Sequence, residues 1–331
     1  MHHQSLTIIA IAFFSALISC SPAPEEREFT VRFESNSSIS VSDQIVREGS
    51  KLLQPPDPAR EGYIFSGWFQ ESTFATEWRF DTDVVTCSMC LYAKWRAKLL
   101  ETITRSNGNS ERYQYDDQNR MTKLSYSHRD TPLNPYQTDE ITYNAGGVPV
   151  KLERKNAENP ASEFIEEYLI QDRIITITYI RSGLPDLILT MNLNSDGYPV
   201  SREYLSGAAT SIHTYSCMNG NLTATSDIRD YGYISVPMYD YEYEYDQMKT
   251  VHFNWNVPNW FMIHYFESAG SKNNVTKASH FVYAQTGENE FTRQLTQTTD
   301  YTWEYDNDGF PVKSKSKLNN GSEIEILYGY N

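Results

Sequence analysis

The decapeptide 303–312, Trp-Glu-Tyr-Asp-Asn-Asp-Gly-Phe-Pro-Val, contains the repeated pattern that decides the fold. An aromatic residue, one spacer, a second aromatic residue and then Asp or Asn lead into a turn, and a new strand begins at the proline. Glycine supplies the positive φ of the turn. Proline has no backbone N–H, and this loss does least harm at the first residue of a strand. The pattern therefore predicts a β-hairpin unit.

Further copies of this unit follow residue 96. The clearest are Tyr113-Gln-Tyr115-Asp116, Ile141-Thr-Tyr143-Asn144, Met191-Asn-Leu193-Asn194 and Tyr243-Glu-Tyr245-Asp246, and weaker ones lie near Ile170 and Cys217. Positions 115, 143, 170, 193, 217 and 245 are 28, 27, 23, 24 and 28 residues apart, which corresponds to one hairpin per unit. The Gly-x-Pro-Val signature recurs at 147–150, 197–200 and 309–312.

Between the turns the hydrophobic period is two. Ile175, Ile177 and Tyr179 alternate with Thr176 and Thr178, so each strand has one apolar face. A meander of a dozen or more such strands would expose that face and two edges unless it closed. We predict an all-β protein whose second domain, residues 97–331, is a large antiparallel meander closing into a barrel or barrel-like sheet.

The apolar face is not expected to contact lipid, because Arg154, Ser314 and Ser316 interrupt it. The second domain resembles a Bacteroidetes lipoprotein domain of unknown function with a porin-like fold, and more loosely the tyrosine-aspartate repeats of Rhs-type surface proteins.

Residues 29–96 carry a different set of motifs. An opening strand at 29–33 is followed by Arg-Glu-Gly-Tyr-Ile-Phe-Ser-Gly-Trp at 60–68 and Leu-Tyr-Ala-Lys-Trp at 91–95. This series resembles the Listeria–Bacteroides repeat, also called the internalin B B-repeat. The resemblance implies a small β-grasp-like module that acts as a spacer or interaction unit on bacterial surface proteins, with no catalytic residue among the matched positions.

The N-terminus predicts export. Residues 1–19 are expected to be a signal peptide, because the apolar run 6–17 is too short for an ordinary membrane-spanning helix. The run ends in Leu-Ile-Ser-Cys20, which resembles the lipobox of bacterial lipoproteins, so Cys20 is expected to carry lipid; an ordinary secretory signal is the alternative. Residues 20–28 form a tether, and its Glu25 and Glu26 resemble surface-export signals of Bacteroidetes lipoproteins. We expect a lipid-anchored outer-membrane protein at the cell surface, with the periplasmic face left open.

Three cysteines remain if Cys20 is lipidated. Cys87 and Cys90 are candidates for a small local disulfide, and Cys217 is expected to be a buried thiol. A redox role for this pair would require a helix N-terminus to lower the thiol pKa, and the sequence predicts none there. A zinc site would require a second pair of ligands at a comparable spacing, and the sequence contains none. The net charge of −15 disfavours a nucleic-acid partner.

No pattern predicts an enzyme, a cofactor or a metal site. The loop 306–309 resembles the first part of a calcium loop, but Lys317 occupies the position at which a calcium loop has its bidentate Glu ligand. The run 239–246 should place four tyrosines on one face and four carboxylates on the other, as a sheet face and a solvated face rather than a cation site.

The most ligand-like stretch is 252–261, where Asn254, Trp255, Trp260 and Phe261 suggest a rim that stacks on sugars or lines a lipid entrance. The alternative, that these aromatic residues cover an open barrel end, is favoured. We expect a non-enzymatic binding lipoprotein for an apolar or glycan ligand, with the repeat module as spacer. The other hypothesis is a structural or adhesive surface protein that acts through protein partners.

Overall fold

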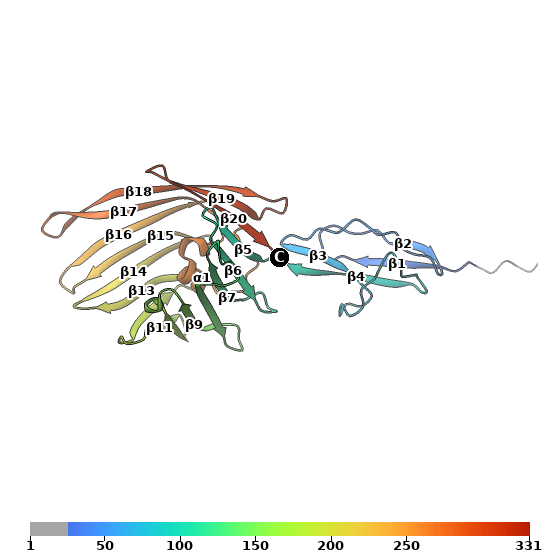
Figure 1. Ribbon diagram of the computed structural model, residues 1–331, viewed down its shortest axis with the longest axis horizontal. Coiled ribbons are helices and arrows are strands. Elements are labelled where there is room, and N and C mark those ends of the chain that lie inside the picture. The colour runs from blue at the N-terminus through green and yellow to red at the C-terminus, as the bar shows by residue number, and fades with distance from the viewer. Residues whose placement is uncertain (1–25) are drawn as a thin grey trace, which may run out of the picture. The chain divides into compact units, whose positions relative to one another are not determined.

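The computed structural model describes residues 26–331 (Figure 1). The predicted signal peptide, Cys20 and Glu25 lie outside the described residues. The described chain divides into two compact units, one made of residues 26–60 and 65–95 and the other of residues 61–64 and 96–331.

The first unit is built on a small mixed sheet. Its strands are β1 (Glu28–Glu34), β2 (Gln44–Arg47), β3 (Tyr63–Phe69) and β4 (Met89–Ala97), in the order β2-β1-β4-β3. Strand β1 pairs antiparallel with β2 and parallel with β4. Phe33 and Trp68 pack edge to face with ring centroids 4.9 Å apart, at the centre of a core that Leu91 completes.

The second unit is a closed antiparallel barrel, so the predicted fold class is confirmed. Sixteen strands of the described chain pair with their sequence neighbours, and β20 closes the ring on β5. The strands are β5 (Leu100–Arg105), β6 (Ser110–Tyr115), β7 (Met121–Ser127), β8 (Gln137–Tyr143), β9 (Pro149–Asn156), β10 (Phe164–Gln171), β11 (Ile174–Ile180), β12 (Leu187–Leu193), β13 (Pro199–Ser206), β14 (Ala209–Met218), β15 (Asn221–Asp230), β16 (Ser235–Tyr245), β17 (Val275–Gly287), β18 (Glu290–Tyr305), β19 (Pro311–Leu318) and β20 (Glu323–Tyr330). A 3-10 turn, η1 (Pro160–Ser162), links β9 to β10.

The Asp or Asn of each repeat organises the turn that follows it. The Oδ1 of Asp306 accepts hydrogen bonds from the backbone N–H groups of Asp308 at 2.9 Å and Phe310 at 3.0 Å. Asp116, Asn144 and Asn194 bond their turns in the same i+2 and i+4 pattern. These loops are side-chain-capped turns, which explains why the repeat requires a short polar residue there.

The apolar face of the strands points into the barrel. Ile175 and Ile177 are fully buried, while Thr176 and Thr178 between them are half-buried on the opposite face. Arg154 and Ser314 lie on the interior face as well, since both line a cavity inside the ring.

The interior is filled by a segment that the repeat does not predict. A sixteen-stranded barrel is too wide for its wall side chains to fill. Between β16 and β17, residues 246–274 enter the ring and form α1 (Asn259–Phe266) and the short helix η2 (Glu267–Gly270) (Figure 1). We call residues 246–274 the plug. Four consecutive residues of α1, 260 to 263, are buried, because a helix that is apolar on all sides must be enclosed.

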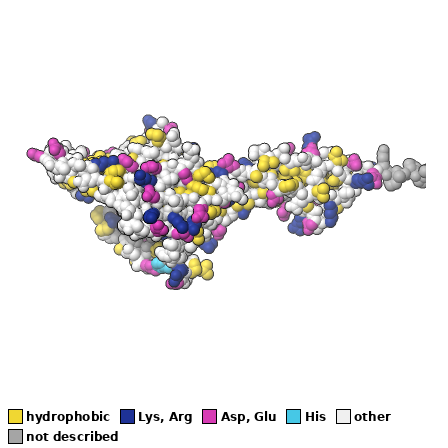
Figure 2. All heavy atoms as spheres, turned by 90° about the horizontal axis from the view of Figure 1, so that it is seen from above, with side chains coloured by type: hydrophobic (Ala, Val, Ile, Leu, Met, Phe, Trp, Pro, Cys, Tyr) yellow, Lys and Arg dark blue, Asp and Glu magenta, His cyan; other side chains and the backbone are white. Residues whose placement is uncertain are grey.

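The outer wall of the barrel is charged. Cross-strand ion pairs join Lys123 to Glu140 at 2.7 Å and Lys313 to Glu325 at 3.0 Å. Basic and acidic side chains are mixed over the visible face of the barrel (Figure 2). Among the described residues, no helix is long and apolar enough to cross a bilayer.

Candidate functional site

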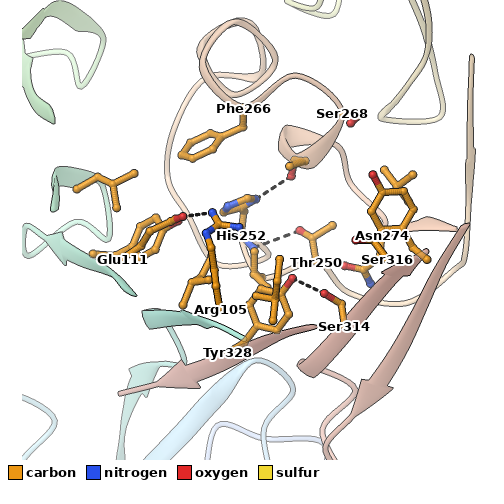
Figure 3. Close-up of a pocket in the computed structure, with 18 of the residues that line it drawn as sticks. Arg105, Glu111, Thr250, His252, Phe266, Ser268, Asn274, Ser314, Ser316 and Tyr328 are labelled. Atoms are coloured by element: carbon orange, nitrogen blue, oxygen red, sulfur yellow. Dashed lines mark hydrogen bonds and ion pairs between the residues drawn. The ribbon is translucent and has the colours of Figure 1, made fainter. Parts of the chain in front are cut away.

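The plug leaves a chamber of about 450 Å³ against one side of the barrel wall, which we call the first chamber (Figure 3). Strands β5 to β7, β9 and β17 to β20 form its wall, and the plug forms the rest of its lining. Aromatic and aliphatic side chains predominate, including Tyr113, Phe266, Trp303 and Tyr328, with polar groups between them. This mixture is typical of small-molecule sites.

Two arginines supply the positive charge of the first chamber. Arg105 of β5 forms an ion pair with Glu111 of β6, and Tyr113 donates a hydrogen bond of 2.7 Å to the same carboxylate (Figure 3). Arg154 of β9 bonds both oxygens of the fully buried Asp139, at 2.8 and 2.6 Å. Burial opposes the charge of Arg154, but the hydrogen bonds and charge of Asp139 outweigh it and raise the pKa of the guanidinium.

Two interior carboxylates, those of Asp139 and Glu166, also bond the plug to the barrel wall. Tyr265 of α1 donates a hydrogen bond to Asp139, and His264 lies 2.9 Å from Glu166 of β10. Burial would raise the pKa of Glu166, yet the charge and hydrogen bond of His264 lower it below its ordinary value. Glu111, Asp139 and Glu166 are each already bonded to a basic side chain and to a tyrosine, which leaves none of the three as a free nucleophile or base.

His252 is the neutral polar group of the first chamber. Burial lowers the pKa of His252 to about 3, so the ring is uncharged at neutral pH. Its Nδ1 lies 2.9 Å from the carbonyl oxygen of Ala269, which can only accept, so Nδ1 carries the proton (Figure 3). The Nε2 of His252 is consequently a hydrogen-bond acceptor.

Comparison with known proteins decides the identity of the first unit. Residues 29–94 match the family model of the Listeria-Bacteroides repeat domain. The first unit therefore matches the Listeria-Bacteroides repeat domain, and we call it the repeat domain. The sequence resemblance at 29–96 is thereby confirmed, and its four-stranded mixed sheet is now described.

Two relatives come from Evansella cellulosilytica. One, described by its name as a Gly-rich membrane protein, is 40% identical over 87 residues, which are 26% of this chain and 10% of the relative. The other, described by its name as a membrane protein, is 38% identical over 82 residues, which are 25% of this chain and 12% of the relative. The chain thus spans only about a tenth of the length of these relatives.

Among solved structures, the chain is similar to a porin-like protein from Bacteroides uniformis. The identity is 14% and the TM-score 0.33, over 70% of this chain and 96% of that protein.

The repeat domain contains the two cysteines considered for a disulfide. Both are free thiols in this structure, Cys87 exposed and Cys90 half-buried. Burial raises the pKa of the Cys90 thiol, which lowers the fraction of thiolate available for oxidation. In the barrel, Cys217 is a half-buried free thiol, and burial raises its pKa to about 11.

The aromatic stretch of the plug does not form an exposed rim. Trp260 is 4% exposed and Phe261 is fully buried, both against Tyr168 of the wall. Trp255 packs inside against Tyr113 and Tyr115. Asn254 donates a hydrogen bond of 3.0 Å to the carbonyl of Lys98. Trp260 and Phe261 therefore present no exposed face on which a sugar could stack, and their burial agrees better with the alternative that these aromatic residues cover the barrel end.

The acidic run of β16 has basic partners. Asp240 and Glu242 both pair with Arg293, at 2.8 and 2.7 Å, and Glu244 lies 3.6 Å from Lys277. The tyrosines of the run face inward, as the alternation predicted. Within residues 26–331 no group of three or more His, Cys, Asp or Glu is arranged to hold a metal ion.

The interior carboxylates were missed by the sequence analysis. Glu111, Asp139 and Glu166 each precede the second aromatic position of a repeat by four residues. An even spacing in a strand places both residues on one face, so these carboxylates had to be interior wherever the tyrosines are. The even spacing from the tyrosine positions was therefore the sequence feature that could have identified these interior carboxylates.

Proposed function

We propose that this protein is a cell-envelope binding protein whose barrel encloses a glycan-type ligand in the first chamber. The observation that carries the proposal is the chamber of about 450 Å³, lined by aromatic faces together with the polar groups of Arg105, His252 and Ser316. Sugars present apolar ring faces and hydroxyl groups together, so they suit such a lining. A long acyl chain would leave the Nε2 of His252 and the hydroxyl group of Ser316 without partners.

The charged outer wall supports a barrel that stands in water. Lipid-facing strands avoid such charges, which are costly at the centre of a bilayer. We therefore propose that membrane attachment comes from lipid on Cys20, which lies outside the described residues, and that the tether and the repeat domain act as spacers. The names of the two Evansella relatives, which place those proteins at a membrane, are consistent with an envelope location.

The pairing of the interior acids supports a non-enzymatic role. Glu111, Asp139 and Glu166 are each bonded to a base and to a tyrosine, so they stabilise the wall and the plug. We propose that the protein binds its ligand without transforming it.

Binding to an immobilised glycan array tests the proposal, with two matched variants of β19. Ser316→Trp adds a large ring to the first chamber, whereas Lys315→Trp adds the same ring to the exposed outer face of the adjacent residue. We expect Ser316→Trp to weaken glycan binding at least tenfold and Lys315→Trp to leave it unchanged. Equal binding by both variants, or binding only to protein probes, would contradict the chamber and favour the adhesive alternative.

Lipid attachment has its own test. We expect the full-length protein to partition into detergent after membrane extraction, and the Cys20→Ser variant to partition into the aqueous phase. A Cys20→Ser variant that stays with the membrane would contradict the proposed anchor.

A further inference from the structure

A second chamber of about 380 Å³ lies in the same barrel, and its lining is different. It is formed by Arg202, His213, Thr225, Tyr239, Tyr241, Tyr243, Glu267 and His280. All but Glu267 come from the strands β13 to β17, and Glu267 comes from η2 of the plug. Nearly every lining residue carries a charge, an imidazole or a hydroxyl, so this chamber suits a strongly polar group.

The wall of the second chamber contains a row of four directly opposed residues. Register pairs Arg202 of β13 with His213 of β14, His213 with Asp227 of β15, and Asp227 with Tyr239 of β16. Neighbouring strands are about 4.8 Å apart, so the four side chains form a continuous belt across the interior face.

Two residues of this belt, His213 and Asp227, are hydrogen-bonded to each other. The Nδ1 of His213 lies 2.6 Å from Oδ2 of Asp227. Burial would raise the pKa of Asp227, but the hydrogen bond and charge of His213 lower it, so this carboxylate is ionised and accepts the Nδ1 proton. The carboxylate of Asp227 is therefore bonded mainly to His213.

Two atoms of the belt have no hydrogen-bond partner within the described residues. His213 is 9% exposed, and its Nε2 is buried without a hydrogen bond. The Nε of Arg202 is also buried without one, although the positive charge of this guanidinium contributes to the lowered pKa values of Asp227 and Glu166. A buried polar group without a partner destabilises the fold, and more so when it is charged. The guanidinium of Arg202 can only donate, so its unpaired Nε–H points to a ligand group that accepts hydrogen bonds, such as a carboxylate, whereas the Nε2 of His213, whose proton is on Nδ1, can accept a hydrogen bond.

We propose that Arg202 and His213 form a carboxylate-binding subsite, and that the ligand of this barrel is an acidic glycan. A guanidinium presents a planar fork of donors that matches a carboxylate, and the adjacent Nε2 of His213, an acceptor because Nδ1 bonds Asp227, can accept a hydrogen bond from a neighbouring ligand hydroxyl. Tyr241, which stacks on His280 with centroids 4.6 Å apart, provides an aromatic surface in the same chamber. The exposed carboxylate of Glu267 faces this chamber from the plug, where it can accept bonds from ligand hydroxyls and disfavours a second anionic group.

The acidic ligand rests on the proposed function, but the two can fail separately. Binding of D-glucuronate, D-glucose and glutarate to the purified protein would be measured by calorimetry, with histidine NMR signals as a second readout. We expect glucuronate to bind at least tenfold more tightly than glucose and to shift the resonance of His213. Binding of glutarate as strong as that of glucuronate would also support the carboxylate subsite, while assigning its ligand to organic acids other than sugars.

Variants of Arg202 decide whether this guanidinium is responsible. Arg202→Gln should abolish the preference for glucuronate over glucose, and Arg202→Lys should retain only part of it because the planar fork is lost. Arg112→Gln removes the same charge from the exposed outer wall, where Arg112 pairs with Glu101, and should change nothing. Because Arg202 makes no ion pair, its removal should leave the thermal midpoint near that of the parent protein.

The outcomes that overturn the inference are specific. Equal binding of glucuronate and glucose, no shift of His213, or an Arg202→Gln variant that binds like the parent would each exclude the subsite. If neutral glycans still bind in a way that depends on Ser316, the proposed function survives that result. If Ser316→Trp changes no glycan binding either, both proposals fail together.

Discussion

The phenol of Tyr143 donates a hydrogen bond of 2.7 Å to the backbone carbonyl of Met121. Tyr143 is the last residue of β8 and Met121 the first of β7, so the bond ties the two strands at the end of the barrel where no hairpin joins them. Tyr115, Tyr245 and Tyr330 make the equivalent bond to the start of the preceding strand, at 2.6, 2.5 and 2.8 Å. At Tyr115, Tyr143 and Tyr245, the second aromatic position of the repeat therefore ties its strand to the preceding one, and we call this bond a strand clamp.

Removing one clamp should destabilise the barrel measurably. We expect Tyr143→Phe to lower the free energy of unfolding by about 1 kcal/mol, because it removes one half-buried hydrogen bond and leaves the Met121 carbonyl without it. Chemical denaturation followed by tyrosine and tryptophan fluorescence would measure the change. Tyr233→Phe is the control, since Tyr233 is 87% exposed and should tolerate the loss. Equal effects of the two substitutions would contradict the clamp.

The capped turns of the repeat provide a second prediction. The Oδ1 of Asn144 accepts hydrogen bonds from the N–H groups of Gly146 and Val148, at 2.9 and 3.0 Å. Asn144→Ala removes both acceptors and should cost about 1–2 kcal/mol of stability. Asn144→Asp keeps the acceptor, as Asp116 and Asp306 do in their turns, and should remain close to the parent in thermal denaturation. A destabilisation of the same size in both variants would show that the capping oxygen is not responsible.

The barrel was predictable because the repeats mark the strand ends and the turns in the sequence itself. Asp306 with Gly309 marks a turn, Tyr305 marks the end of the strand before it, and the period of two orients the rest. The plug was not predictable in the same way. Residues 246–274 lack the repeat, and the buried run from Trp260 to Ile263 shows neither a helical nor a strand period. From the sequence alone, the aromatic stretch 252–261 could be interpreted only as a ligand-binding rim or as a cover for the barrel end, without its helix or its position inside the ring.

The two chambers depend on information that spacing does not contain. The belt from Arg202 to Tyr239 requires the register of four strands, and bulges at Ser216/Cys217 and Asp227/Ile228 shift that register along the way. A one-residue error would turn His213 to the outer face. The first chamber likewise depends on where the plug stops, which is decided by packing against the whole wall rather than by local pattern.

His252 should make the barrel sensitive to mild acid. Its pKa is about 3 in the folded protein, against 6.5 as its ordinary value, so the unfolded chain binds the proton first as the pH falls. Stability is therefore expected to decrease from about pH 6.5 downwards, and to continue decreasing until the folded ring protonates near pH 3. Thermal midpoints measured from pH 7 to pH 5 would show the slope.

Replacement of His252 tests the origin of that slope. His252→Phe keeps a ring beside Trp255 and Phe266 but cannot titrate, so its midpoint should vary less between pH 7 and pH 5. Glu166 and Asp227 have lowered pKa values, and the stability they contribute is lost only as the pH falls below the ordinary carboxylate range, outside this window. An unchanged slope in His252→Phe would assign the acid sensitivity to other groups.

The packing of η2 against α1 within the plug should be disrupted by a single methyl group at Gly270. A Cβ at this position would lie 2.3 Å from the carbonyl oxygen of Met262 and 2.6 Å from its carbonyl carbon. Both are backbone atoms of α1 and cannot rotate away, so Gly270→Ala should force η2 and α1 apart and cost about 1–3 kcal/mol of stability. Gly146→Ala is the matched control, because its nearest neighbour is a side-chain oxygen at 3.3 Å. Since Ser268 and Ala269 of η2 line the first chamber, Gly270→Ala should also weaken glycan binding there, whereas Gly146→Ala should not. A fully stable Gly270→Ala protein would mean that the turn between α1 and η2 is looser than this contact requires.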